Sequence, residues 1–371
     1  MAGLLKGMER GGRSFLRGAF HLIPRSRSAS IRSLADAGIR RILVVRLDNR
    51  LGNLLLITPF LHALRRGFPG ATIDLLVSRA FFEVFHGNPD IDRLIVADKA
   101  GFICRPWRFV SFLSGLRSRN YDLSFDMSSS HTFSVSSATL VRLAGSPLRV
   151  GYRRGESDRF LNVLIDPPAG GLHEAEFHLG LLKGIIPRDE APRLWYFVSE
   201  EEEAAGSEMV GRLALRDGPI VGVFLGARGD KAWGDRNFLE VAREVAGDYP
   251  VLIMGGDREK GHLETIDGGT RGNWRVAPVL PLRRFAALVK QCALFISGDC
   301  GPMHLAAALG IPVLAVFTVD NHARYGPLGE GNRVIYDPSR STSAAVIETA
   351  REILSSIPAG TETTGGKGAA S

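Results

Sequence analysis

The chain has 371 residues, of which 45% are hydrophobic, so it is long enough for two globular domains and too apolar to be disordered throughout. Its three cysteines (Cys104, Cys292 and Cys300) have no metal-ligand spacing and are too few for a disulfide scaffold, which is typical of a reducing compartment. The net charge of +7 belongs to residues 1–41, where nine Lys and Arg accompany two acidic residues. The remaining chain is electrically balanced.

The N-terminal arm, residues 1–40, mixes basic residues with large apolar ones at roughly helical spacing. This pattern favours a peripheral contact with an anionic membrane surface, and a soluble leader is the alternative. Arg17 and His21 interrupt every apolar run before it reaches the length of a signal peptide core. No stretch approaches the roughly 18 apolar residues of a spanning helix. We expect no nucleic-acid partner, because the rest of the chain adds no basic, aromatic-lined face.

From residue 41 onward, apolar strand-like runs alternate with helix-like segments, which predicts doubly wound parallel sheets. In the first half we expect strands at 41–45, 72–77, 93–96, 123–126 and 149–152, and helices at 53–68, 81–85, 107–117, 135–144 and 173–185. In the second half we expect strands at 219–225, 250–254, 293–297 and 312–317, and helices at 200–214, 235–246, 282–291, 303–309 and 346–355. The predicted domains are 41–186 and 218–357, with a linker and helix at 187–217 and a disordered tail at 358–371.

Two glycine-bearing turns, each between a strand and a helix, carry the strongest signals. The first runs from Arg46 to Pro59 and the second from Ser297 to Leu309. Backbone N–H groups and the dipole of a starting helix can hold an anion at such a turn. Two units of this kind suggest two nucleotide-fold halves that face one cleft.

The second turn suits a diphosphate. Gly298 and Gly301 permit a tight bend, and the N–H groups of Gly301, Met303 and His304 would be free donors at the helix start. Asp299 can accept a hydrogen bond from a sugar hydroxyl. The alternative is that Asp299 caps the helix and His304 is a packed core residue.

Two further loops follow predicted strands of the second half. Arg228 and Lys231 come after the strand that ends at Leu225, where ligands bind in open α/β sheets, and a lysine can neutralise a phosphate. A solvated loop with Trp233 covering the core is the alternative. Asp257 follows Gly255-Gly256, where a carboxylate can bond ribose hydroxyls, although this sequence is also ordinary turn chemistry.

In this order, the motifs resemble the glycosyltransferase family 9 heptosyltransferases of bacterial lipopolysaccharide synthesis, from about Arg41 to Tyr336. The matching stretches are Arg46-Leu-Asp…Leu-Gly…Thr58-Pro59, Phe68-Pro69, Arg149-Val-Gly-Tyr152, His173-Glu-Ala-Glu176, Gly226-Ala-Arg…Lys231-x-Trp233, Gly298-Asp-x-Gly-x-x-His304-Leu-Ala-Ala-Ala-Leu-Gly310 and Arg324-Tyr-Gly-Pro327. The resemblance implies a GT-B fold, an α/β architecture of two Rossmann-like domains facing one cleft. It also implies an N-terminal acceptor domain, a C-terminal domain for a nucleotide sugar that is usually ADP-heptose, and an inverting transfer without metal or other cofactor.

Carried over by position, the resemblance also assigns residues to the two substrates. On the donor side, Lys231 would contact the phosphates, Asp257 the ribose, and Leu280 would lie near adenine. The turn of Asp299, Cys300, Gly301, Met303 and His304 would hold the diphosphate and the donor sugar. The candidates for the anionic acceptor, a lipopolysaccharide core or similar lipid-linked saccharide, are Arg149, Arg153 and Arg154. Such an acceptor would place a cytoplasmic protein against the inner membrane, through residues 1–40.

The first turn departs from the family pattern. The family usually has an Asp after the glycine, thought to act as general base, whereas Asn53 stands here and the loop is one residue longer. An amide cannot take a proton at neutral pH. Three readings remain open: Asp48 serves as the base, His173 or a substrate oxyanion serves while Asn53 positions the acceptor, or the chain is weakly active or non-catalytic.

Two functions other than sugar transfer remain as alternatives. One is a nucleotide-sugar-binding relative without turnover. The other, a dinucleotide-dependent oxidoreductase, is less favoured because the first strand is not followed by a Gly-x-Gly-x-x-Gly turn.

Overall fold

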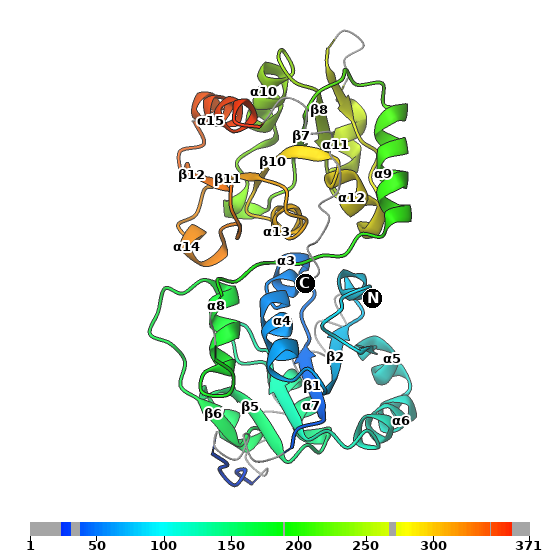
Figure 1. Ribbon diagram of the computed structural model, residues 1–371, viewed down its shortest axis with the longest axis vertical. Helices are drawn as coiled ribbons and strands as arrows, with labels where there is room; N and C mark the ends of the chain where they lie inside the picture. The colour runs from blue at the N-terminus through cyan, green and yellow to red at the C-terminus, as the bar shows by residue number, and fades with distance from the viewer. Residues whose placement is uncertain (1–23, 31–37, 188–189, 267–271, 342, 358–371) are drawn as a thin grey trace.

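The computed structural model describes residues 24–30, 38–187, 190–266, 272–341 and 343–357. Figure 1 shows two domains, one above the other, each built on a six-stranded sheet in which all paired strands are parallel. The strand order is β3-β2-β1-β4-β5-β6 in the first sheet and β12-β11-β10-β7-β8-β9 in the second. The predicted doubly wound α/β architecture is confirmed.

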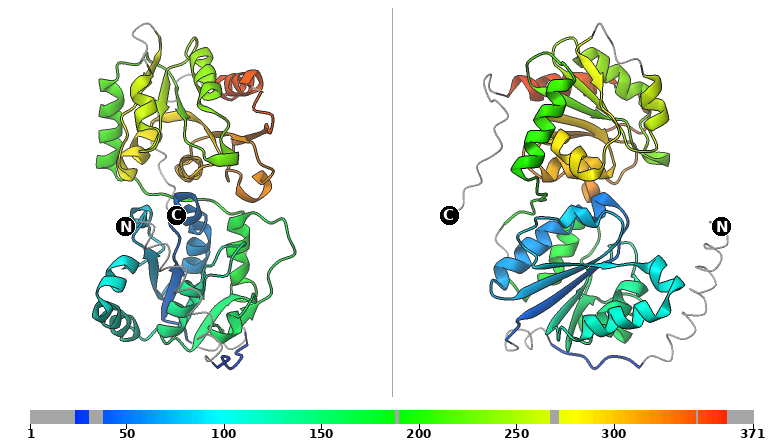
Figure 2. Two further views of the ribbon diagram at one scale, coloured as in Figure 1. Left: turned by 180° about the vertical axis from the view of Figure 1, so that it is seen from behind. Right: turned by 90° about the vertical axis from the view of Figure 1, so that its right-hand side faces the viewer.

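The inner strands are continuous apolar runs because helices cover both faces of each sheet (Figure 2). The first sheet comprises β1 (Arg41–Arg46), β2 (Thr72–Ser78), β3 (Arg93–Ala97), β4 (Leu123–Asp126), β5 (Leu148–Tyr152) and β6 (Val163–Ile165). The second comprises β7 (Ile220–Phe224), β8 (Val251–Met254), β9 (Trp274–Val276), β10 (Cys292–Gly298), β11 (Val313–Phe317) and β12 (Arg333–Tyr336).

The α-helices follow the strands in alternation. Those of the first half are α3 (Leu51–Leu55), α4 (Thr58–Gly67), α5 (Lys99–Cys104), α6 (Pro106–Arg117), α7 (Val135–Leu143) and α8 (Glu174–Leu179). Those of the second are α9 (Glu200–Arg212), α10 (Asp235–Val245), α11 (Lys260–Thr265), α12 (Leu282–Val289), α13 (Gly301–Ala308), α14 (His322–Tyr325) and α15 (Ser343–Ser355). Short 3₁₀ turns occur at η1 (Phe82–Phe85), η2 (Ser157–Arg159), η3 (Gly180–Leu182) and η4 (Gly229–Lys231).

Two helix predictions need correction. The single helix expected over 53–68 is two helices, α3 and α4, because Pro59 has no N–H to donate to Leu55 O, and the Thr58 hydroxyl donates to that carbonyl at 2.8 Å instead. The helix expected to run to about residue 185 is α8, which ends at Leu179 and continues only as the 3₁₀ turn η3.

Each sheet has one switch point, where the chain changes the direction in which it adds strands. In the first sheet this point lies between β1 and β4, and in the second between β7 and β10. Ligands of open α/β sheets bind beyond the carboxyl ends of the strands at such a point. The helices that follow β1 and β10, α3 and α13, contact each other at the junction of the two domains (Figure 1). Both switch points therefore open toward the same junction.

Within the described residues, the chain passes from the first sheet to the second once, between η3 and α9. The helix α9 packs against α12 of the second domain, and Arg283 forms an ion pair with Glu202 at 2.5 Å. The domain limits at 186/187 and 217/218 stay predictions. Most of the N-terminal arm and the C-terminal tail lie outside the described residues, and no helix of the described part is long and apolar enough to cross a bilayer.

Candidate active site

The second switch point brings together the loops that follow β7 and β10. Lys231 Nζ lies 2.5 Å from Asp299 Oδ2, and Asn321 Nδ2 donates to the same oxygen at 2.9 Å. The loops can adjoin because residue 298 is glycine: a Cβ added there would lie 3.0 Å from Ala227 Cβ. Lys231 and Asp299, predicted from separate motifs, therefore form one charged cluster at the crevice.

The turn that begins α13 has the features of an anion site. Its N-cap is Cys300, which makes no side-chain cap hydrogen bond, and the Asp299 carboxylate contacts Lys231 and Asn321 instead of capping the helix. The free N–H groups of that turn can therefore donate to a ligand. Burial raises the pKa of the Cys300 thiol to about 12, so the thiol is inert.

His304 is both a packed residue and part of this turn. It is buried, and a Cβ on Gly52 of the first domain would lie 2.6 Å from its Cδ2. Burial lowers the pKa of His304 to about 4, so the ring is neutral at physiological pH. Its Nδ1 is buried and has no partner within the protein.

The remaining donor-side predictions lie at the rim. Arg228 and Asp257 are exposed, and Leu280 is partly buried against the core. The carboxylate that contacts the turn after β8 is Glu259, whose Oε2 accepts from Gly256 N at 2.9 Å. Sequence reasoning selected Asp257 and missed Glu259. The available signal was its position three residues after Gly256, the spacing at which a side chain can accept from a turn N–H.

The first switch point is organised around Asp48. Asn53 Nδ2 donates to Asp48 Oδ2 at 2.8 Å, and Arg50 N donates to Asp48 Oδ1 at 3.0 Å. Arg46 Nη2 lies 3.3 Å from Asp48 Oδ2 and also donates to Asn53 O at 3.3 Å. This loop therefore brings the Asp48 carboxylate directly beside Asn53, at the position where the resemblance implies an Asp.

His173 is placed differently. Its Nδ1 accepts from Ala175 N at 3.2 Å and its Nε2 lies 3.0 Å from Gly326 O, which fixes the proton on Nε2. Burial lowers the pKa of His173 below its usual value, so the neutral ring is favoured. With both ring nitrogens engaged, His173 connects the two domains and has no free lone pair with which to accept a substrate proton.

Beneath this crevice lies a buried cluster of polar and charged side chains, Arg46, Asp126, Glu174 and His178, with the half-buried Arg154 beside it. Sequence reasoning selected Arg154 but missed Asp126, Glu174 and His178. Burial raises the pKa of Asp126, at the end of β4, to about 7, and Ser128 Oγ donates to its carboxylate at 2.8 and 2.9 Å. The sequence did contain a signal for Asp126, because it is a single charged residue at the end of the predicted strand Leu123–Asp126.

This cluster fixes the strand-end loops to one another. Arg46 donates to Met127 O, which ties the loop after β1 to the loop after β4. Glu174 accepts from the N–H of Ser130 at 2.9 Å and from its hydroxyl, and lies 3.5 Å from His178 Nε2. The loop that carries Asp48 is therefore connected to the neighbouring strand-end loops through this buried cluster.

The three predicted acceptor arginines separate in space. Arg149 is the second residue of β5, so it lies at the opposite edge of the sheet from the crevice, bonded to Phe160 O and Ser146 O at 2.8 Å. The structure does not bring it into the site, because only the carboxyl ends of parallel strands reach the switch point. Arg153 and Arg154 follow the carboxyl end of β5; Arg153 pairs with Asp166 at 2.8 Å, and Arg154 donates to Ser129 O at 2.6 Å.

Residues of both domains meet between the two crevices. Lys231 Nζ lies 5.4 Å from the centre of the Tyr325 ring, and that ring stacks on His131 of the first domain at 6.1 Å. Arg324 Nη1 lies 2.9 Å from His131 Nε2. The charged cluster of the second domain and the loops of the first therefore lie side by side at the junction.

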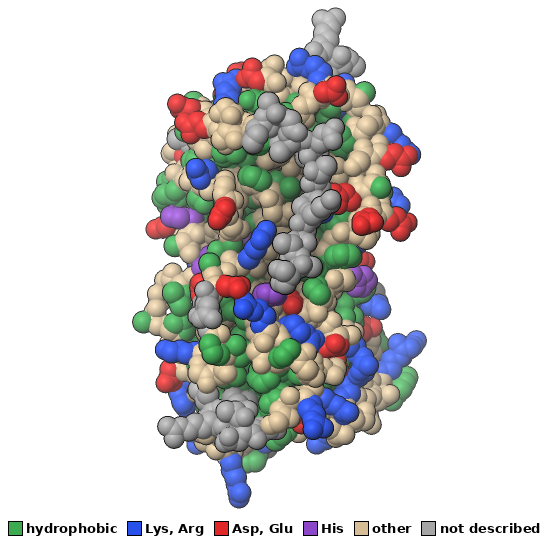
Figure 3. Space-filling model, in the orientation of Figure 1, with side chains coloured by type: hydrophobic (Ala, Val, Ile, Leu, Met, Phe, Trp, Pro, Cys, Tyr) green, Lys and Arg blue, Asp and Glu red, His purple; other side chains and the backbone are tan. Residues whose placement is uncertain are grey.

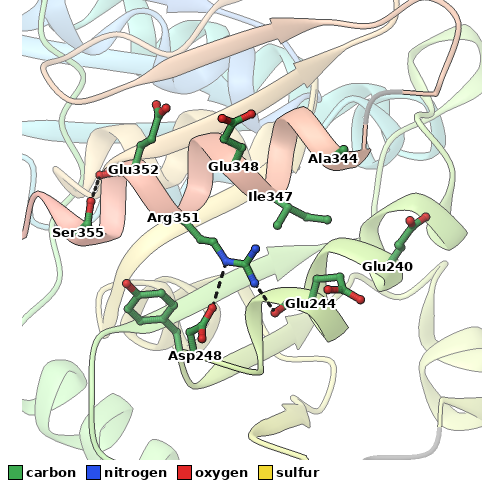
Figure 4. Close-up of a pocket in the computed structure, with 10 residues that line it drawn as sticks. Glu240, Glu244, Asp248, Ala344, Ile347, Glu348, Arg351, Glu352 and Ser355 are labelled. Carbon is green, nitrogen blue, oxygen red and sulfur yellow. Dashed lines mark hydrogen bonds and ion pairs between the residues drawn. The ribbon is translucent and has the colours of Figure 1, made fainter.

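A separate hollow of about 700 Å³ lies between α10 and α15, away from the junction (Figure 4). Its carboxylates are Glu240, Glu244, Asp248, Glu348 and Glu352, and Arg351 is already paired with Asp248 at 3.0 Å. Such a lining repels phosphates, so this hollow is not a nucleotide site. The described residues also contain no group of three or more His, Cys, Asp or Glu side chains that could hold a metal ion.

Comparisons with known proteins bear on the family and the fold. Residues 109–352 match the family model described as glycosyltransferase family 9 (heptosyltransferase). Lipopolysaccharide heptosyltransferase 3 of Escherichia coli K12 is 26% identical over 75% of this chain and 83% of its own length. Lipopolysaccharide heptosyltransferase 2 of the same strain is 25% identical over 76% and 84%.

Solved structures show the same fold. A family 9 glycosyltransferase from Veillonella parvula superposes with a TM-score of 0.75 at 23% identity, covering 85% of this chain and 97% of that one. E. coli heptosyltransferase WaaC with ADP gives a TM-score of 0.69 at 22% identity, covering 84% and 99%. The predicted GT-B fold is confirmed, and this chain belongs to glycosyltransferase family 9.

Proposed function

We propose that this enzyme transfers a heptose from ADP-heptose, with inversion, to a lipopolysaccharide core or similar lipid-linked saccharide. The observation that carries the proposal is the pairing of Asp48 with Asn53 across the junction from the Lys231–Asp299 cluster. A proton acceptor on one side and an anion-binding turn on the other are the two parts that sugar transfer from a nucleotide requires. ADP-heptose is proposed because WaaC, which shares the fold, is solved with ADP.

In the proposed reaction the acceptor hydroxyl attacks the anomeric carbon. The new C–O bond forms as the bond to the diphosphate breaks, and Asp48 takes the hydroxyl proton. Asn53 keeps the Asp48 carboxylate oriented through its 2.8 Å hydrogen bond. Because the ring nitrogens of His173 are both engaged, Asp48 is the better-supported base.

The leaving nucleoside diphosphate is stabilised on the other side of the junction. Lys231 would exchange its contact with Asp299 for the phosphates, and the N–H groups at the start of α13 would donate to them. Fixed donors of this kind need no reorganisation during the reaction, which makes them a large catalytic contribution. His304 Nδ1, buried and unpartnered, is a candidate for the donor sugar, and Glu259 and Asp257 are candidates for the ribose.

The acceptor is proposed to lie over the first domain, near Arg153 and Arg154. Its lipid anchor would hold the enzyme at the cytoplasmic face of the inner membrane, with residues 1–40 as an additional contact. This part of the proposal rests on composition and on the family's acceptors.

Calorimetric titration with ADP, UDP, GDP and NAD tests the donor site first. We expect selective ADP binding that Lys231→Ala weakens. Selective binding of another nucleotide would contradict the proposed donor, and NAD binding would favour an oxidoreductase.

Transfer assays with ADP-heptose and a truncated lipopolysaccharide then test the base. Asp48→Asn should lower kcat by about 10²–10⁴-fold without changing ADP affinity. The exchange variant, Asp48→Asn with Asn53→Asp, should recover part of the rate because it returns a carboxylate to the pair. ADP binding without any transfer by the unmodified protein would instead support the non-catalytic relative.

A further inference from the structure

Helix α6 is apolar on two opposite faces. Its inner face packs on the first domain through Phe109, Phe112 and Leu113, and Leu116 is buried. Its outer face carries Trp107 and Val110, which are 67% and 66% exposed. No other large hydrophobic residue of the described chain is exposed by more than half.

The outer face has an ordered arrangement. Leu116 follows Trp107 by nine residues, which is about half a turn out of phase at ~3.6 residues per turn, so Trp107 points directly away from the core. On the same geometry Arg108 and Arg117 lie on opposite flanks of Trp107, and Ser111 and Ser114 lie beside it. An apolar centre with basic flanks is the pattern of a helix that lies in a lipid interface.

The charge around α6 is unusual for this protein. Residues 99–120 contain five Lys and Arg and no Asp or Glu, although residues 42–371 are balanced as a whole. Figure 3 shows Lys and Arg gathered on the lower right of the molecule, where α5 and α6 lie in Figure 1. A hollow of about 350 Å³ between α6 and β3 is lined by Arg108 and by Arg119, whose guanidinium pairs with Asp74 at 3.3 Å.

Helix α6 is also packed against its neighbour α5. The Phe102 ring of α5 packs on Phe109 at 5.3 Å and on Phe112 at 5.0 Å, between ring centres. Holding the helix in place before contact lowers the entropy lost on binding. The surface presents a protruding tryptophan between small residues, which suits a fluid bilayer better than a shaped protein pocket.

We propose that the outer face of α6 docks on an anionic lipid bilayer, with Trp107 and Val110 entering the interface and Arg108 and Arg117 contacting lipid phosphates. The residues of this surface belong to α6 and not to the chain segment 1–40, and they lie outside both crevices. The inference does not depend on the proposed transfer reaction.

The test uses the full chain with vesicles of phosphatidylcholine, alone or with phosphatidylglycerol, prepared with brominated acyl chains that quench nearby tryptophan. We expect quenching on the anionic vesicles, most of which disappears in Trp107→Phe. The partition coefficient should fall at least about tenfold in Arg108→Glu/Arg117→Glu, because each basic residue at a lipid surface contributes roughly fivefold. The matched control is Arg236→Glu/Arg243→Glu, which makes the same charge change on exposed residues of α10.

Three results would overturn the proposal. The first is vesicle binding with the same quenching in Trp107→Phe as in the unmodified protein, which would assign the contact to the arm. The second is equal loss of binding in the two charge-reversal variants, which would make the effect one of net charge alone. The third is no binding to anionic vesicles. An unchanged unfolding transition in each variant shows that none of these results comes from misfolding. A second and milder pair of variants is Val110→Ser, with Val334→Ser as its control.

Discussion

Single residues at the first crevice depend on their neighbours for their chemistry. Asp126 is buried beside Arg46 and Arg154, and its pKa rises to about 7 because burial outweighs those two cations. Asp48, at the rim of the same loops, instead accepts hydrogen bonds from Asn53 and Arg50. One carboxylate is therefore enclosed by the fold, and the other stays partly accessible to solvent.

Asp126 should make stability depend on pH. Its folded pKa of about 7 lies above the ordinary value of 3.8, so folding favours the protonated form. The stabilisation is complete below about pH 4 and is lost as the pH rises through 7, with a slope of up to about 1.4 kcal/mol per pH unit. In urea titrations across this range, Asp126→Asn should remove that slope, whereas the exposed control Asp257→Asn should keep it. Parallel curves for the unmodified protein and Asp126→Asn would contradict the assignment.

Gly52 should be intolerant of a side chain, although it lies in a helix. Replacing a helical glycine with alanine usually stabilises by about 0.5–1 kcal/mol. Here the new Cβ would lie 2.6 Å from His304 Cδ2. Gly52→Ala should therefore loosen the domain junction, seen as faster hydrogen exchange in α3 and at the start of α13. His304→Ala should relieve the effect, and failure of this rescue would show that the contact is not its cause.

At the scale of elements, side-chain hydrogen bonds and ion pairs at the ends of helices stabilise them. Ser199 and Glu202 form a reciprocal capping box at the start of α9, and Glu202 also binds Arg283 of α12. Because α9 is the first element after the passage between domains, this cap holds the passage against the second domain.

Removing the cap should destabilise the second domain measurably. Ser199→Ala should lower the free energy of unfolding by about 0.5–2 kcal/mol, the usual cost of losing an N-cap side chain. Ser111→Ala, in the exposed face of α6, is the control and should be neutral or slightly stabilising. Denaturant titration measures both changes. Equal behaviour of the two variants would mean that the box contributes nothing to stability.

The inner strands were predictable because a strand covered on both faces is a continuous apolar run. The strands β6, β9 and β12, which have three or four residues at sheet edges, were missed because so short a run carries no clear period. The glycine turns at the starts of α3 and α13 were predictable from local sequence, and the anion binding expected at α13 stays a prediction. The cluster of Asp126, Glu174 and His178 was not, because it depends on which loops the sheet order places side by side.

At the scale of the whole molecule, two six-stranded sheets of the same topology meet at one junction. Each presents the carboxyl ends of its strands at one switch point, and α3 and α13 bring those points together. Contacts such as His173 to Gly326 and His131 to Arg324 then span the junction. The two halves are chemically different although their architecture is the same.

ADP should protect mainly one half. At about a hundred times its Kd, a ligand that binds only the folded form stabilises by about 2.7 kcal/mol. In hydrogen-exchange measurements this increase should appear in β7, β10 and α13, and not in the strands β2 and β5 of the first domain. Lys231→Ala should abolish the protection at equal ADP concentration. Uniform protection of both sheets would mean that the domains unfold as one unit.

The single passage between η3 and α9 has a consequence for inheritance. Each half of the described chain is encoded by one uninterrupted stretch, so one recombination event within the passage would exchange the complete second domain. The new half would need to match its partner only at the junction, chiefly at Gly52 and at the surface around His131. A chain built in this way can exchange one switch point and its loops without rebuilding the other.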